Sequence, residues 1–248
     1  MPAKTISFLD DSEWPASCFA VDLPIDPRRA GLCVVDMQNY CVDPSGDLAH
    51  SLRLHDARLF DQFLERAQDA IARTAELVAG FRGARRRVVF TRHGSLLPDG
   101  GDLVERRRRR ERVARGAASE QSGHLPVAGS PGHSIVSALT PRPGELVLDK
   151  NTSSAFNSTA LDLFLRNMGL TTLVFAGLVT EQCVLMTALD AADRGFHCII
   201  AADGCATIDR GSHEAALLMF RRVWGYVLPS REILAWVASK EQRRGALQ

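Results

Sequence analysis

The sequence predicts a doubly wound α/β layer fold, in which helices cover both faces of a mostly parallel sheet of about six strands. Two observations lead to this prediction. Short apolar runs recur along the chain without strict alternation, as expected for parallel strands that are buried on both faces. Helical patterns separate these runs and the connections are short, which favours parallel strands joined by crossover helices.

Five apolar runs are predicted strands, and a sixth run is weaker. Ligands of such sheets bind at the carboxyl ends of the strands. Side chains that follow the runs are therefore the first candidates for a functional site. In chain order the runs are Gly31–Asp36, Arg87–Thr91, Glu145–Asp149, Thr172–Gly177, His197–Asp203 and the weaker Val223–Leu228.

Helical patterns lie between and after these strands. Apolar residues form a helical stripe along Asp61–Phe81. Gly169 and Gly195 each follow a helical pattern, and glycine at that position is a common helix stop. The other predicted helices are Thr159–Met168, Gln182–Arg194, Ser212–Arg222 and Ser230–Ser239.

Length and composition limit the class of protein. The 248 residues suffice for one α/β domain with a sizeable core, and the net charge of +1 gives no field that favours nucleic acid or an anionic membrane. No apolar run approaches the roughly 20 residues of a membrane span, and the N-terminus lacks a secretion pattern. Six cysteines occur without a CxxC pair, which disfavours a disulfide framework and a zinc ribbon. We expect a cytoplasmic protein with reduced thiols and no nucleic-acid or membrane partner.

Two segments stand apart from the predicted sheet. Residues 1–24 form a polar arm, ahead of a domain at residues 25–248. Residues 94–143 form an insertion that is interpreted as a lid or an oligomer contact. Its Arg-rich run at residues 105–112 is interpreted as a solvated face, neutralised by Glu105, Glu111 and Glu120, with RNA or phosphate binding as the alternative.

Cys183 is the candidate nucleophile. The predicted strand ends at Gly177 and a helix starts near Gln182, so Cys183 lies in the first helical turn. The positive end of the helix dipole favours a thiolate there, and the exposed main-chain N–H groups suit an oxyanion. Thr180 is a candidate cap of this helix. The alternative is a buried cysteine in an ordinary β–α turn.

Asp36 and Lys150 are the candidate partners of this thiol. Asp36 closes the first predicted strand, and Lys150 directly follows the third. A lysine ammonium lowers the pKa of a neighbouring thiol, and a carboxylate can accept its proton and later return it to the leaving amine. Singly, such an Asp is often a helix cap and such a Lys a surface charge. We expect these two strand ends to be adjacent to one another and to Cys183.

Three spaced motifs resemble the isochorismatase-like cysteine hydrolase superfamily, which includes N-carbamoylsarcosine amidases, biuret hydrolases, ureidoacrylate amidohydrolases and nicotinamidases. They are VVDMQNYC, the long segment DKNTSSAFNSTALDLFLRNMGLTTLVFAGLVTEQCV, and ADGCAT. The resemblance covers roughly residues 25–237. It implies a Rossmann-like three-layer fold, a homo-oligomer (dimer or tetramer) and an Asp36–Lys150–Cys183 triad. It also implies a cis peptide at Leu178–Val179, with the N–H groups of Val179 and Cys183 as oxyanion donors.

Departures from two subfamilies narrow the chemistry. Isochorismatases resemble the chain but lack the cysteine, so Cys183 argues against vinyl-ether hydrolysis. Nicotinamidases carry a metal site with an Asp-Trp-His segment, where this chain reads TRHGSLL, with His93 but without matching partners. Asp47, His50 and His55 lie too early in the chain to replace that site, and loop histidines are usually solvated. We therefore expect no metal and no other cofactor.

The predicted function is cysteine-dependent hydrolysis of the C–N bond of a small amide, carbamoyl or ureido compound. Two alternatives are a metal-assisted nicotinamidase-like amidase and a catalytically silent family member that acts as a binding module. The predicted substrate contacts follow the catalytic residues along the chain, and Phe156 is equally well interpreted as a core residue. These contacts are Gln38, Tyr40, Asn151, Phe156, Asn157 and Thr180.

Overall fold

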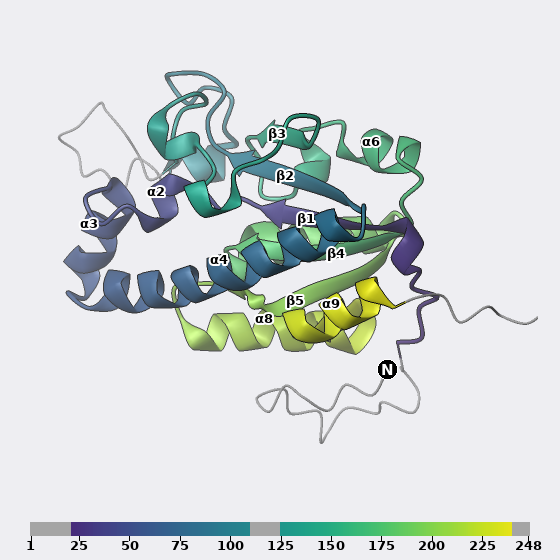
Figure 1. The fold of residues 1–248 in the computed structure, drawn as a ribbon. Helices are drawn as coiled ribbons and strands as arrows, with labels where there is room; N and C mark the ends of the chain where they lie inside the picture. The colour runs from purple at the N-terminus through teal and green to yellow at the C-terminus, as the bar shows by residue number, and fades with distance from the viewer. Residues whose placement is uncertain (1–20, 110–124, 240–248) are drawn as a thin grey trace, which may run out of the picture.

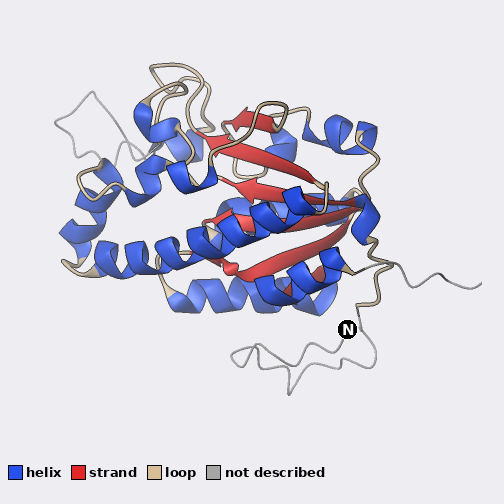
Figure 2. Cartoon of the chain, viewed as in Figure 1, coloured by secondary structure: helices blue, strands red, loops and turns tan. Residues whose placement is uncertain are grey.

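The computed structural model describes residues 21–109 and 125–239, and it has the predicted α/β architecture (Figures 1 and 2). Within these residues, six strands form one sheet in the order β3-β2-β1-β4-β5-β6, and every neighbouring pair is parallel. The strands are β1 (Ala30–Val35), β2 (Arg87–His93), β3 (Leu146–Lys150), β4 (Thr172–Leu178), β5 (His197–Ala206) and β6 (Gly225–Leu228).

Helices cover both faces of this sheet and make three layers (Figure 1). Two helices bury their apolar sides on one face, α4 (Leu59–Gly83) and α9 (Ser230–Ala238). Three helices pack on the other face, α6 (Leu161–Asn167), α7 (Leu185–Asp193) and α8 (Arg210–Val223). Each face has its own buried apolar cluster, so the strands are apolar on both sides, as the non-alternating runs predicted.

The segment between β1 and α4 contains two short helices, α2 (Asn39–Val42) and α3 (Asp47–His55). This segment continues from the carboxyl end of β1, and α2 packs near the described part of the insertion at Pro131–His133. Arg53 on α3 pairs with Asp61 at the start of α4 at 2.8 Å. The loops at this end therefore surround the edge of the sheet where the candidate site was predicted.

The turn after β4 differs from its prediction. A π-helical turn, Thr180–Val184, precedes α7, so Cys183 lies in this turn and α7 begins two residues later. The predicted cap is also wrong, because Val179 is the residue before the turn and the Thr180 hydroxyl pairs with His213 Nδ1 at 2.8 Å. Such turns are frequent at functional sites, and periodicity within a helical stretch does not reveal them.

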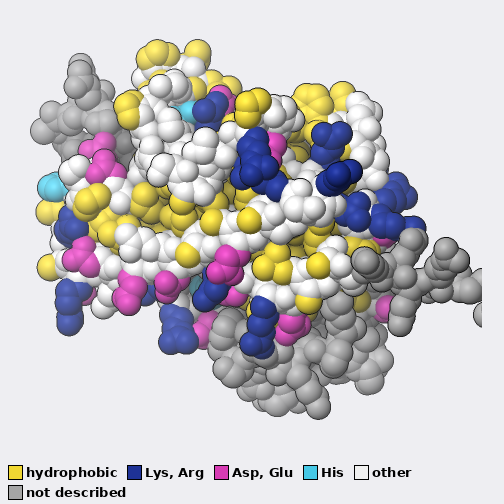
Figure 3. Space-filling model, in the orientation of Figure 1, with side chains coloured by type: hydrophobic (Ala, Val, Ile, Leu, Met, Phe, Trp, Pro, Cys, Tyr) yellow, Lys and Arg dark blue, Asp and Glu magenta, His cyan; other side chains and the backbone are white. Residues whose placement is uncertain are grey.

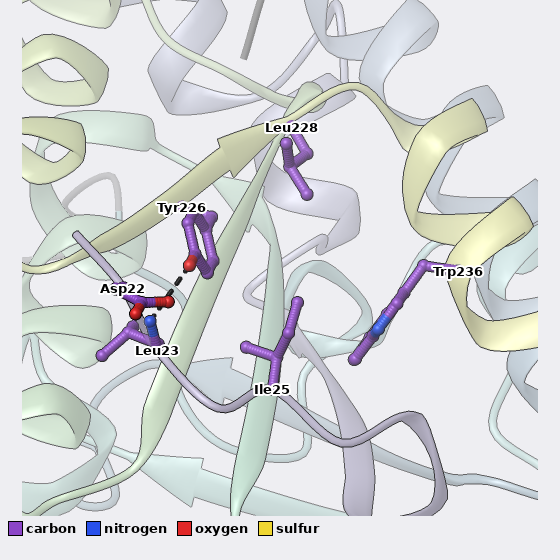
Figure 4. Close-up of a pocket in the computed structure, with 6 residues that line it drawn as sticks. All are labelled: Asp22, Leu23, Ile25, Tyr226, Leu228 and Trp236. Carbon is purple, nitrogen blue, oxygen red and sulfur yellow. Dashed lines mark hydrogen bonds between the residues drawn. The ribbon is translucent and has the colours of Figure 1, made fainter. Parts of the chain in front are cut away.

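A cavity of about 200 Å³ lies away from the predicted site (Figure 4). At its wall, the Tyr226 hydroxyl accepts a hydrogen bond from the Leu23 main-chain N–H at 3.0 Å. Its walls come from the segment before β1, from β6 and from α9, namely Asp22, Leu23, Ile25, Tyr226, Leu228 and Trp236. None of these residues was a predicted site residue.

The face drawn in Figure 3 carries basic and acidic side chains interspersed, in line with the net charge of +1. Within residues 21–109 and 125–239, no helix is long and apolar enough to cross a membrane. The described cysteines are all buried and free: Cys33, Cys41, Cys183, Cys198 and Cys205.

Candidate active site

The ends of three strands and the turn after β4 bring polar side chains together at the carboxyl edge of the sheet. Asp36 follows β1, Lys150 ends β3 and Cys183 follows β4. The sheet order places β2 between β1 and β3, so the expectation that the strand ends of Asp36 and Lys150 are adjacent is wrong. Lys150 reaches Asp36 past the end of β2, and β2 adds Thr91 and His93 to the site.

Asp36 is held in one orientation by two partners. Its Oδ1 accepts a hydrogen bond from the Thr91 hydroxyl at 2.6 Å, and its Oδ2 lies 2.7 Å from Lys150 Nζ. The residue is 1% exposed and has a φ of 51°, in the left-handed region that is rare for non-glycine residues. Such conformations concentrate at functional sites, where the surrounding structure maintains them.

Lys150 is a fully buried ammonium. Its Nζ lies 2.7 Å from Asp36 Oδ2 and 3.4 Å from Cys183 Sγ. It also donates to the main-chain oxygens of Thr152 and Ser153, at 2.9 Å and 3.0 Å. Although burial opposes the charge, Asp36 and Cys183 raise the pKa of Lys150 above its ordinary value. The ammonium therefore stays charged at neutral pH.

Cys183 carries a protonated thiol at neutral pH. Burial raises the pKa of Cys183 to about 12, although the Lys150 charge lowers it and Asp36 raises it further. Loss of solvent therefore opposes the thiolate that the helix start is predicted to favour, and it outweighs the nearby positive charge. The thiol needs a proton acceptor before it can attack, and Asp36 lies within 4.8 Å.

Glycine at position 177 lets the nucleophile turn approach β1. Its φ is +152°, and a Cβ atom there would overlap the carbonyl oxygen of Val35, the last residue of β1. Val35 precedes Asp36, so this close contact keeps the ends of β1 and β4 together. The peptide bond between Leu178 and Val179, next along the turn, is cis.

His93 was not predicted to belong to the site. The sequence pointed to a solvated loop histidine, but His93 is 3% exposed and ends β2. Its Nδ1 lies 3.6 Å from Cys183 Sγ. Burial, followed by the Lys150 charge, lowers the pKa of His93 well below its ordinary value, so the ring is neutral. Its place at a strand end was the available signal, as it was for Asp36 and Lys150.

Comparison with known proteins identifies the family, because residues 30–232 match the isochorismatase domain. The chain belongs to the isochorismatase family. A ureidoacrylate amidohydrolase RutB from Methylobacterium radiotolerans is 34% identical over 220 residues, covering 83% of this chain and 78% of the relative. A RutB from Methylorubrum extorquens is 33% identical and covers 91% of this chain and 92% of the relative.

Solved structures share the fold of this chain. An N-carbamoylsarcosine amidase from Thermoplasma acidophilum has a TM-score of 0.61 and 26% identity, covering 82% of this chain and 96% of that one. A cysteine hydrolase from Pseudomonas syringae pv. phaseolicola has a TM-score of 0.72 and 24% identity, covering 88% and 96% of the two chains. The predicted family and fold are confirmed, and the chain is an isochorismatase-family hydrolase.

Among the described residues, one set of three side chains lies close enough together to be tested as a metal site. Among the described residues, Asp36, His93 and Cys183 each offer a ligand atom, and these atoms lie within 4.8 Å of one another. The Lys150 ammonium, 2.7 Å from Asp36 Oδ2, already supplies the positive charge there. A divalent ion would place a second cation beside it, so the group does not fit a metal. The other three residues considered for metal, Asp47, His50 and His55, are exposed on α3.

Gln38 supports the isochorismatase-family site through the main chain. Its Oε1 accepts from the His93 N–H at 2.7 Å. Both hydrogens of its Nε2 are used, towards the oxygens of His93 at 3.1 Å and His133 at 2.9 Å. The prediction that Gln38 contacts substrate is therefore corrected: its buried amide joins the end of β2 to the insertion.

Three other predicted substrate contacts are Phe156, Asn157 and Thr180. Phe156 is in the core, 6.3 Å from the ring of Phe196, in the apolar cluster that also contains Cys183. Asn157 is exposed, and Thr180 is buried with its hydroxyl on His213. None of these side chains has a described hydrogen bond to the catalytic candidates. The contact of these three residues with substrate stays a prediction.

Tyr40 and Asn151 remain beside the site. Burial, followed by the charges of Cys41, Cys183 and Asp36, raises the pKa of Tyr40 well above its ordinary value, so its hydroxyl stays protonated. Asn151 Nδ2 donates to the main-chain oxygen and the carboxylate of Asp102, at 3.1 Å and 3.0 Å. Because Asp102 belongs to the insertion, this contact fastens the insertion to the residue after Lys150. The pairing of Asn151 with substrate stays a prediction.

Parts of other predictions lie outside the described residues. These parts are residues 1–20 of the arm with Cys18, and residues 110–124 of the insertion with Glu111 and Glu120. Glu105 is described, and it pairs with Arg108 at 2.8 Å and Arg109 at 2.9 Å, as the predicted neutralisation requires. The lid or oligomer role of the insertion stays a prediction, as does the homo-oligomer.

Proposed function

We propose that this isochorismatase-family hydrolase, an amidohydrolase, cleaves the C–N bond of a small amide, carbamoyl or ureido compound through a covalent intermediate on Cys183. One observation carries the proposal. The buried Lys150 Nζ lies 2.7 Å from Asp36 Oδ2 and 3.4 Å from Cys183 Sγ. A carboxylate, an ammonium and a thiol in contact supply a base, a fixed positive charge and a nucleophile.

The first half of the reaction forms the covalent intermediate. Asp36 accepts the thiol proton, and the Cys183 sulfur adds to the substrate carbonyl carbon, so that a C–S bond forms and the carbonyl electron pair moves to oxygen. Lys150 stabilises the thiolate, and the N–H groups of Val179 and Cys183 are the proposed donors to the oxyanion. The C–N bond then breaks, and Asp36 returns its proton to the leaving nitrogen.

The second half of the reaction releases the enzyme. Asp36 removes a proton from water, and the hydroxide adds to the carbonyl carbon of the thioester-like intermediate. The C–S bond breaks, and the sulfur regains a proton from Asp36. The charges of Asp36 and Lys150 are the same at the end as at the start, so the cycle needs no further co-reactant.

The substrate is proposed to carry a ureido or carbamoyl group. Relatives in Methylobacterium and Methylorubrum are ureidoacrylate amidohydrolases, and they cover most of the chain at 33–34% identity. A structurally similar relative is an N-carbamoylsarcosine amidase. Both names describe substrates with an N-carbamoyl group. The protonated hydroxyl of Tyr40, whose pKa responds to the charges of Cys183 and Asp36, is the proposed donor to such a group.

The test combines a substrate screen with a search for the intermediate. Ammonia release is measured with ureidoacrylate, carbamoyl amino acids, biuret and nicotinamide, with and without a chelator. Acid-quenched enzyme is then examined by mass spectrometry. We expect turnover of an N-carbamoyl substrate in the presence of the chelator, with an acyl adduct on the Cys183 peptide. Turnover without an acyl adduct on the Cys183 peptide would contradict the proposal. Loss of turnover when the chelator is added would also contradict it.

A further inference from the structure

His93 is a second neighbour of the Cys183 sulfur that the proposed triad does not use. Its Nδ1 lies 3.6 Å from Sγ, and its ring is 3% exposed. The main chain of His93 is fixed on both sides by the amide of Gln38, at 2.7 Å and 3.1 Å. The ring therefore meets the sulfur from a rigid strand end, without any movement of the chain.

The thiolate needs a hydrogen-bond donor that Lys150 cannot fully provide. An ammonium has three hydrogens. Lys150 Nζ has four acceptors around it: Asp36 Oδ2 at 2.7 Å, the oxygens of Thr152 and Ser153 at 2.9 Å and 3.0 Å, and Cys183 Sγ at 3.4 Å. Sulfur is a larger atom than oxygen, so all four distances are within hydrogen-bond range, and three hydrogens are shared among four acceptors.

We infer that His93 is a positioning residue that donates its Nδ1–H to the Cys183 sulfur as the thiolate forms. This inference rests on the proposed function, in which Cys183 is the nucleophile. Asp36 takes the thiol proton, and no proton leaves the imidazole, so His93 is neutral before and after the step. The thiolate is then held by the shared Lys150 hydrogen and by a neutral N–H of fixed direction.

Burial and the charges around His93 keep its ring neutral. Burial lowers the pKa of His93 most, and the positive charges of Lys150 and Arg107 lower it further. His133 acts in the same direction, while the Asn151 main chain opposes it. A neutral ring carries its hydrogen on one nitrogen, and its Nε2 has no described hydrogen-bond partner. Placing the hydrogen on Nδ1 gives it an acceptor, the sulfur.

His133 offers a matched control. It is also a buried histidine, fully unexposed, and burial lowers its pKa as well. Its contacts differ, since its Nδ1 accepts from the Gly129 N–H at 3.4 Å and its Nε2 lies 3.9 Å from Asp149. Replacing His133 therefore tests the loss of a buried imidazole near the site without removing a contact to the sulfur.

The experiment compares His93→Asn, His93→Gln and His93→Leu with His133→Asn. Asparagine carries an amide N–H about as far along the side chain as Nδ1, glutamine about as far as Nε2, and leucine has no donor. The readouts are kcat and the pH dependence of iodoacetamide alkylation of the Cys183 peptide, followed by mass spectrometry. A merely structural role would not move the thiol titration.

We expect His93→Leu and His93→Gln to lower kcat and the alkylation rate near neutral pH roughly 10- to 100-fold, the range of one hydrogen bond to a charged group. His93→Asn should recover most of both, and His133→Asn should match the wild type in the alkylation profile. An unchanged profile in His93→Leu, or no recovery in a folded His93→Asn, would overturn the inference.

A measurement on the unaltered protein covers the case in which the variants fail to fold. Nitrogen NMR of histidine-labelled enzyme reports which ring nitrogen of His93 carries the hydrogen. We expect Nδ1 protonated, and a protonated Nε2 with bare Nδ1 would overturn the inference. The two proposals fail separately. If the Cys183→Ser variant keeps its activity, the proposed function is wrong. If Cys183→Ser is inactive but the thiol of His93→Leu titrates as in the wild type, only the role of His93 is wrong.

Discussion

The turn after β4 and strand β5 both bury cysteines against the same sheet, but they surround the sulfur differently. Cys183 has Lys150 at 3.4 Å and His93 at 3.6 Å. Cys205, on β5, is 5% exposed in the apolar cluster. Burial raises the pKa of each thiol to about 12. Burial therefore gives both thiols the same resting protonation, and we expect the partners of Cys183 to make it the reactive one.

The largest expected difference between the two regions is in turnover. Cys183→Ser should lower kcat roughly 10⁴-fold or more, because a serine hydroxyl in the same place is a far weaker nucleophile. Cys205→Ser should stay within a few-fold of the wild type, since the charge that acts on its sulfur is that of Asp203, and no ammonium lies beside it among the described contacts. Steady-state ammonia release on both variants measures this. Similar losses in two well-folded variants would show that the distinction between the two thiols is wrong.

Replacing Lys150 makes the surroundings of Cys183 resemble those of Cys205. Lys150→Met leaves Asp36 buried without its cation, so we expect the free energy of unfolding to fall by about 3–5 kcal/mol and turnover to be lost. Urea unfolding measures the first effect. The double variant Asp36→Asn with Lys150→Met should recover stability but not activity, because it removes both charges together.

Arg92→Met is the control for the Lys150 variant. Arg92 pairs with Asp149 at 2.6 Å at the same strand ends, but both side chains are about 30% exposed, at 30% and 33%. Solvent screens such a pair, so we expect a loss of about 1 kcal/mol or less. A loss as large as that of Lys150→Met would mean that burial does not distinguish the two ion pairs.

A last effect is shared by the two regions and concerns stability at alkaline pH. The pKa of both thiols is raised to about 12 in the folded protein from an ordinary value of 9.0. The unfolded chain releases these protons first, so the contribution of each thiol is complete below pH 9 and is lost as the pH rises towards 12. The free energy of unfolding therefore falls with pH in this window. Cys183→Ala and Cys205→Ala should each make that fall smaller by about 1.4 kcal/mol per pH unit.

Urea unfolding at pH 8, 9 and 10 measures this decline. Equal flattening by the two alanine variants would sharpen the comparison, because it would show that the two regions share thiol protonation and differ in chemistry. A flatter curve for Cys205→Ala alone would show instead that Lys150 holds Cys183 as a thiolate in the resting enzyme, against the effect of burial.

The sequence by itself determined the layer architecture and three strand-end positions. Apolar runs without alternation identify strands buried on both faces, and the carboxyl ends of parallel strands gather at one edge of the sheet. Asp36, Lys150 and Cys183 follow such runs, and the structure brings them within contact. Local pattern therefore sufficed wherever the position along a strand decides the position in space.

The tertiary structure alone decided the order of the strands and what burial does to each group. Because β2 lies between β1 and β3, Thr91 and His93 belong to the site. Their contacts with Asp36 and Cys183 depend on the order of the strands, which the spacing of residues along the chain does not predict. Gln38 is committed to the main chain for the same reason, since its partners are 55 and 95 residues away. The protonated state of Cys183 also depends on how completely the fold excludes water, which is a property of packing in three dimensions.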